Sequence, residues 1–151
     1  MSGTPDVAGP IPAEATVLAF DFGTRRLGVA VGNTLVRVAH PLDTIDDETT
    51  GARFAAIAAL IDEWQPKLLI VGVPVHADGT EHAMTQRARR FARQLEGRFG
   101  LPVAEADERG TTQEAERSLR GTGRRGRAQR DEVAAQLILQ GYFDERRPDR
   151  G

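Results

Sequence analysis

Three acidic residues, Asp21, Glu108 and Asp131, stand where carboxylates could do chemistry. Asp21 lies within the apolar run 17–22, where an ionised carboxylate costs free energy unless a metal ion or a hydrogen-bond donor compensates it. Glu108 follows a second apolar run, and Asp131 shares a helical face with Ile138. If the fold gathers the three acids, their mutual repulsion favours a cation, and all-oxygen ligands favour Mg²⁺ or Mn²⁺. Two such ions would activate a water and stabilise the leaving oxygen of a phosphodiester.

Each acid also has an ordinary structural interpretation. Asp21 could accept hydrogen bonds from the following Gly23–Thr24 turn, and Glu108 could be a solvated turn residue. Asp131 could be an acid favoured by the positive end of a helix dipole. Asp107 and Glu132 are candidates for a fourth ligand only because they neighbour these acids in the sequence. The metal-site hypothesis therefore depends on the tertiary arrangement.

A run of arginines without a single acid lies between residues 117 and 130, on a Gly-rich segment expected to be a loop between two helices. Guanidinium groups suit phosphate oxygens, so the segment predicts a loop that grips nucleic acid. The predicted substrate-binding residues are Arg109, Arg124, Arg125, Arg127 and Arg130. The alternative is a solvated charge run. A second set, Arg87, Arg89, Arg90 and Arg93, is interpreted as the outer face of a helix.

Strands must position the first two acids. The runs 17–22 and 27–32, separated by a four-residue turn, predict a β-hairpin, and the alternating stretch 36–42 predicts a third strand near an edge. The apolar runs 67–74 and 101–107 predict two strands parallel to the first, which then lies near the middle of the sheet.

Helices are predicted from period-3.6 apolar stripes. One begins at about Thr50 and ends before Pro66, and the next has Thr80 as its cap and Gly100 as its stop. A capping box at 111–114 predicts a short helix, the glycines of 121–129 break the pattern, and a last helix is expected from about Arg130 to Glu145. The fold class is thus α/β: a mixed five-stranded sheet, its first three strands antiparallel, with helices on both faces.

Length and composition predict one domain. We expect a disordered N-terminal tail over 1–15, the domain over 16–145 and a polar tail over 146–151. The net charge of −2 gives no global attraction to polyanions, so nucleic acid must be bound by a local patch. The chain has no cysteine, no signal-peptide pattern and no apolar run near the ~18 residues that span a membrane. These features predict a cytoplasmic protein without a membrane partner.

Four linked motifs carry a family resemblance over residues 16 to 145. They are Leu18–Gly32, Val71–Pro74 with Asp78–Glu81, Asp107–Thr112 and Asp131–Leu139. Together they resemble the YqgF family of bacterial Holliday-junction-resolvase-like nucleases. The chain departs from the family pattern at Gly110, Arg130 and Glu132, which bears on substrate handling more than on the metal site.

The resemblance implies a ribonuclease-H-like nuclease that matures the 5′ end of the small-subunit ribosomal RNA precursor. Asp21, Glu108 and Asp131 occupy the family's acidic positions, as catalytic residues and as ligands of one or two ions. The alternatives are a resolvase of branched DNA and a non-catalytic nucleic-acid-binding module, as a monomer or a homodimer. Asp-Phe-Gly-Thr also resembles the phosphate loop of actin-like ATPases and sugar kinases, but those enzymes clamp nucleotide between two such domains.

Overall fold

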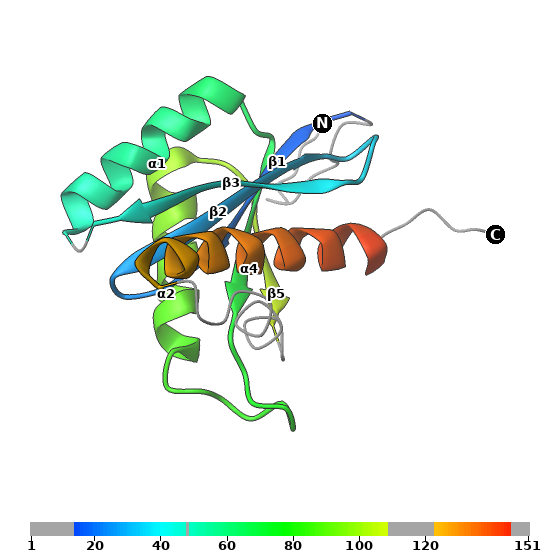
Figure 1. Ribbon diagram of the computed structural model, residues 1–151. Helices are drawn as coiled ribbons and strands as arrows, with labels where there is room; N and C mark the ends of the chain where they lie inside the picture. The colour runs from blue at the N-terminus through cyan, green and yellow to red at the C-terminus, as the bar shows by residue number, and fades with distance from the viewer. Residues whose placement is uncertain (1–13, 48, 109–122, 146–151) are drawn as a thin grey trace.

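A five-stranded mixed sheet forms the centre of the protein (Figure 1). The computed structural model describes residues 14–47, 49–108 and 123–145, with backbone only for 123–130. The strands are β1 (Thr16–Asp21), β2 (Arg26–Asn33), β3 (Ala39–Asp46), β4 (Leu68–Val73) and β5 (Val103–Asp107). The helices are α1 (Thr50–Trp64), α2 (Thr85–Phe99) and α4 (Gly123–Glu145).

The sheet order is β3-β2-β1-β4-β5, so β1 is the central strand, as predicted. It pairs antiparallel with β2 and parallel with β4, and β4 pairs parallel with β5. The carboxyl ends of β1, β4 and β5 therefore meet at one edge of the sheet. The predicted α/β class, with three antiparallel strands first, is confirmed.

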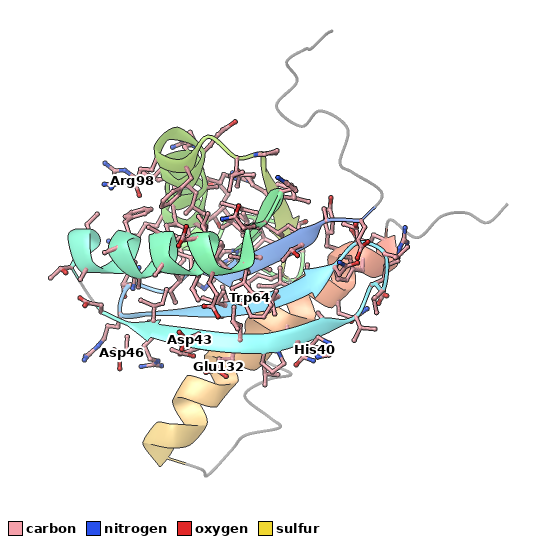
Figure 2. All side chains as sticks on the ribbon, turned by 90° about the horizontal axis from the view of Figure 1, so that it is seen from above. His40, Asp43, Asp46, Trp64, Arg98 and Glu132 are labelled. Carbon is pink, nitrogen blue, oxygen red and sulfur yellow. The ribbon has the colours of Figure 1, made fainter. Side chains whose placement is uncertain are left out.

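Helices cover both faces of the sheet, as predicted (Figure 2). Successive side chains of a strand alternate between faces. In β1, Leu18 and Phe20 join the core formed with α1 and α2, whereas Val17 and Ala19 join the core formed with α4. This alternation places Asp21 on the α4 face and Phe22 on the opposite face.

The ends of α1 are those that the sequence predicted. The Thr49 hydroxyl accepts the backbone N–H of Ala52 at 3.3 Å, which caps the first turn. The helix ends at Gln65, which has a left-handed backbone with φ of 49° and donates its N–H to the Ile61 carbonyl. Pro66 follows and cannot continue the helix.

The start of α2 was predicted too early. Thr80 caps no helix there, because its backbone N–H and hydroxyl both donate to the Asp78 carboxylate, at 2.9 and 2.7 Å. These bonds form a turn that lies beside an isolated bridge between Val75 and Glu81. The helix begins five residues later, at Thr85.

The predicted bounds of β3 were wrong as well. The strand begins at Ala39 and runs to Asp46, whereas the prediction was 36–42. The Asn33 side chain accepts the N–H groups of Leu35 and Val36, at 2.7 and 3.2 Å, which turns the chain before the strand begins. β3 is an edge strand, as expected.

The last helix is longer than predicted. It begins at Gly123 instead of near Arg130, so the expected Gly-rich loop is helical from Gly123 onward. Arginine, alanine and glutamine are good helix formers, and a glycine costs a helix only about 1 kcal/mol, which neighbouring turns can absorb. The helix predicted from the capping box at 111–114 lies outside the described residues. No helix among the described residues is long and apolar enough to cross a membrane.

Candidate active site

Asp21 ends β1 on the face that α4 covers and is half-buried. The pKa of its carboxyl is raised well above the ordinary value, chiefly by burial and then by the neighbouring Glu108 and Asp131. A carboxylate with a raised pKa holds its proton unless positive charge replaces it. Burial and the neighbouring acids therefore disfavour the ionised form of Asp21, and a nearby cation would favour it.

Glu108 meets Asp21 from the end of β5. Its backbone N–H donates to the Val73 carbonyl at 3.2 Å, which continues the β4–β5 pairing by one residue. Its side chain is only 6% exposed and shares a hydrogen bond with the carboxyl group of Asp21. Asp107, one residue earlier, is exposed instead. The alternation of the strand thus directs Glu108 and not Asp107 to the buried position.

Two glycines make the space around Asp21. Gly28 of β2 and Gly72 of β4 are its partners on either side in the sheet register. A Cβ at Gly28 would lie 2.0 Å from the Asp131 carbonyl oxygen, so α4 crosses directly over this residue. A Cβ at Gly72 would lie 2.3 Å from Cδ1 of Ile138 and 3.2 Å from Oε2 of Glu108. Neither glycine was predicted to shape the site, although each lies inside a predicted strand, where glycine is unusual.

Asp131 approaches the pair from α4. Its Oδ2 accepts from Nε of Arg26, the first residue of β2, at 2.5 Å, and both side chains are largely buried. Its charge also contributes to the raised pKa of Asp21. Within the part of the chain that the structure describes, no three histidine or acidic side chains are arranged to hold a metal ion. The fold therefore joins Asp21 and Glu108 directly and holds Asp131 beside them, on Arg26.

Glu132, a candidate fourth ligand, turns toward β3. It accepts a hydrogen bond from the Thr44 hydroxyl at 3.2 Å and lies beside Asp43 (Figure 2). Burial raises the pKa of its carboxyl, the Thr44 hydroxyl opposes that effect, and Asp43 and Asp131 add to it. Its hydrogen bond fastens α4 to the edge strand.

Arg53 was not predicted to have a role, yet it fixes the β1–β2 turn beside Asp21. The side chain is 6% exposed, and its two terminal nitrogens donate to the carbonyls of Gly23 and Thr24, at 2.8 and 3.2 Å. Its guanidinium carbon lies 5.6 Å from the centre of the Phe22 ring. Burial lowers the pKa of this arginine, and Asp47 partly offsets the effect. A charged residue next to Phe54 in the apolar stripe of α1 was the available signal.

The predicted substrate-binding arginines are Arg109 and four residues at the start of α4. Arg109 lies outside the described residues, and so do the side chains of Arg124, Arg125, Arg127 and Arg130. The backbone of the last four is helical, so they belong to the first turns of α4 and not to a loop. Their role in substrate binding stays a prediction.

Comparison with known proteins relates this chain to nucleases. Residues 15–145 match the family model described as RuvX, Holliday junction resolvase. A protein of Methylobacillus flagellatus named "Putative pre-16S rRNA nuclease" is 55% identical over 141 residues, covering 89% of this chain and 97% of that one. Its counterpart of the same name in Nitrosomonas europaea is 59% identical over 135 residues, with 87% and 91% covered.

Solved structures show the same fold. The Thermus thermophilus RuvC structure matches with a TM-score of 0.50 and 16% identity, over 87% of this chain and 95% of that one. The yeast mitochondrial Holliday junction resolvase Ydc2 matches with a TM-score of 0.51 and 12% identity, over 91% and 81%. The predicted ribonuclease-H-like fold is thereby confirmed.

Proposed function

The chain belongs to the RuvX family, and from that premise we propose that it is a metal-dependent endonuclease whose substrate is the precursor of the small-subunit ribosomal RNA. The observation that carries the proposal is the buried carboxyl pair of Asp21 and Glu108. Two acids in contact inside a protein are costly unless a proton or a cation separates their charges. A bound cation would remove the repulsion between the two carboxylates, so the pair should favour binding of a metal ion.

The residues present suit Mg²⁺ or Mn²⁺. The donors are carboxylate oxygens, which these hard ions prefer, and the glycines at 28 and 72 place no side chain between them. Asp21 and Glu108 would hold the ion or ions, and Asp131 would complete the set. When bound, such an ion lowers the pKa of a water and neutralises charge on the leaving oxygen of a phosphodiester.

Arg26 has a specific part in this proposal. It holds the Asp131 carboxylate in one orientation while no ion competes for it. Because Asp131 lies beside Asp21, the Arg26 guanidinium that binds Asp131 would also offer positive charge to a phosphate at the acids. The ion pair is therefore the part of the site that we expect to change when substrate arrives.

The choice of RNA over branched DNA follows the names of the two relatives, both above 50% identity. The family description names a Holliday junction resolvase instead, so a four-way junction is the second candidate substrate. A non-catalytic nucleic-acid-binding module is the third possibility, and it would give the buried acid pair no chemical purpose.

Asp21→Asn tests the activity. The amide keeps the shape of the side chain but removes the charge that would hold the ion, so cleavage should fall by a factor of at least about 10³. The assay compares a ribosomal RNA precursor with a four-way DNA junction, each with Mg²⁺, with Mn²⁺ and with a chelator. Asp62→Asn, an exposed change near the end of α1, is the matched control and should cleave like the wild type. Equal cleavage by the two variants would rule out the proposed site.

A further inference from the structure

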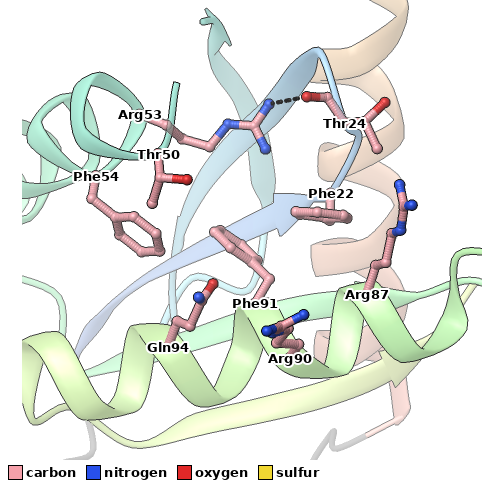
Figure 3. A pocket seen from close by; sticks show the side chains of 9 residues that line it. All are labelled: Phe22, Thr24, Thr50, Arg53, Phe54, Arg87, Arg90, Phe91 and Gln94. Atoms are coloured by element: carbon pink, nitrogen blue, oxygen red, sulfur yellow. Dashed lines mark hydrogen bonds between the residues drawn. The ribbon is translucent and has the colours of Figure 1, made fainter. Parts of the chain in front are cut away.

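A pocket of about 470 Å³ opens on the face of the sheet opposite to the acids (Figure 3). It lies between α1, α2 and the β1–β2 turn, and Arg53, Arg87 and Arg90 all line it. Phe22, Thr24 and Gln94 are among the other lining residues, and no acidic residue of the described ranges lines the pocket. The pocket therefore concentrates positive charge in a chain whose formal net charge is −2.

Arg53 lines this pocket and has a buried donor without a partner among the described residues. Its two terminal nitrogens bind the turn, but its Nε is buried and has no hydrogen-bond partner within the described ranges. A buried donor without a partner costs free energy, more so when it carries charge. An anion in the pocket would offset this cost by neutralising the charge of the guanidinium group.

Arg87 and Arg90 are the second observation. They are three residues apart on α2, and both line the pocket (Figure 3). Neither makes a hydrogen bond or an ion pair with the residues that the structure describes. Their neighbour Arg89, in contrast, binds Glu81 at 3.1 Å and Glu105 at 3.5 Å. Arg87 and Arg90 are exposed, as the predicted outer face of the helix requires, and they also line the pocket.

Aromatic rings supply the apolar part of the pocket. Phe22 is half-buried and packs on Phe91 with ring centres 5.0 Å apart. A flat aromatic wall beside guanidinium groups and an amide can accept a base or a sugar together with its phosphate. The volume is within the range of sites that bind small organic groups.

The position of the pocket connects it to the carboxyl pair. Phe22 directly follows Asp21, and the two side chains lie on opposite faces at the end of β1. We propose that this pocket binds a nucleotide of the strand that is cleaved at Asp21 and Glu108, with its phosphate on Arg87 and Arg90 and its base or sugar against Phe22. The nucleic-acid strand would then pass around the carboxyl end of β1. This inference rests on the proposed function.

Binding is tested in the Asp21→Asn protein, where cleavage cannot interfere. The double change Arg87→Ala and Arg90→Ala is compared with Lys67→Ala and Arg93→Ala, which removes the same charge at exposed positions outside the pocket. The probe is a fluorescent single-stranded RNA of about ten nucleotides, titrated at several salt concentrations. The pocket variant should bind about tenfold more weakly than the control. Its salt slope should be smaller than that of the control by about 0.7, the value for one lost phosphate contact on a single strand.

Three outcomes are informative. If the pocket variant and the control bind alike, with equal salt slopes, the inference is overturned. A nucleoside 5′-monophosphate titrated in parallel should bind far more weakly than the RNA, and equal affinity would assign the pocket to free nucleotides instead of a strand. If Asp21→Asn cleaves like the wild type, the proposed function fails, but the binding comparison still decides whether the pocket holds RNA. Circular dichroism checks that both double variants keep their helices.

Discussion

The Asp21 carboxyl group, which we propose as a metal ligand, is costly to the folded protein when it is ionised. Burial and two neighbouring acids raise its pKa, so folding favours the protonated form. A group whose pKa is higher in the folded state stabilises the protein most below its unfolded pKa, near 3.8, and loses that contribution as the pH rises toward the folded pKa. As the pH rises, the ionised acids therefore destabilise the folded protein, and a bound cation would offset that cost.

This effect predicts a pH-dependent difference in stability. In a metal-free buffer, the free energy of unfolding of the wild type should fall relative to that of Asp21→Asn between pH 4 and 7, by at most about 1.4 kcal/mol for each pH unit. Urea denaturation at several pH values measures it. Parallel pH curves for the two proteins would contradict the raised pKa. Added Mg²⁺ at pH 7 should stabilise the wild type and leave the variant nearly unchanged.

At the scale of the element, the site depends on how closely α4 lies on the sheet. The absence of side chains at Gly28 and Gly72 lets the helix bring Asp131 over β2 and leaves room for Glu108 and Ile138 over β4. Arg53 of α1 fixes the turn between β1 and β2 from the other face. The geometry of the acids is thus set by packing on both sides of one strand end.

Substitution of Gly72 should therefore damage stability and activity together. Gly72→Ala places a methyl group against Cδ1 of Ile138 and close to Glu108, at an expected cost of about 1–3 kcal/mol. Adding Ile138→Val removes Cδ1 and should restore part of the loss, because the two positions are coupled. Thermal and urea denaturation of the four proteins of this cycle, with cleavage assays, measure both effects.

The matched control is Gly51→Ala, in α1, where an added Cβ would meet no atom within 4 Å. Alanine is the better helix former, so this variant should be as stable as the wild type or gain up to about 1 kcal/mol. If Gly72→Ala proved as harmless as the control, close packing of α4 would not be what shapes the site.

At the scale of the whole molecule, charge is distributed so that an acidic chain can still bind a polyanion. The acids lie on the α4 face, the arginine pocket lies on the α1 and α2 face, and further arginines occupy the first turns of α4. Nucleic acid that contacted all of them would surround the carboxyl end of β1. Local patches of this kind, and not the net charge, would then govern affinity.

The start of α4 can be tested in the same manner. Arg124→Ala with Arg125→Ala should weaken binding of the single-stranded RNA. It should also lower the salt slope, because a protein with fewer phosphate contacts releases fewer counterions from the RNA when it binds. Helix formation should be unaffected, since alanine replaces arginine at little cost. Fluorescence titrations at several salt concentrations measure the slope, with Lys67→Ala and Arg93→Ala as the control. A slope equal to that of the control would mean that these arginines are only solvated.

Much of the architecture could be predicted because it is encoded locally. The continuous apolar run of β4 and the stripe of α1 specify an element type by their period, and the linked motifs indicated the acids and the fold class. The errors also have local causes. Side chains that bind nearby backbone, Asn33 before β3 and Asp78 before α2, replaced the expected elements with turns, and α4 extended through glycines that were interpreted as a break.

What only the tertiary structure decided is which groups meet. The sequence identified Asp21, Glu108 and Asp131 as candidate site residues. The structure added three features that join residues distant in the chain: the contact between Asp21 and Glu108, the bond from Arg26 to Asp131, and the pocket lined by three arginines. Such contacts depend on strand order, register and the close approach that glycines permit. Period and propensity carry no information about them, because they describe each segment alone, whereas a site is made by the distances between segments.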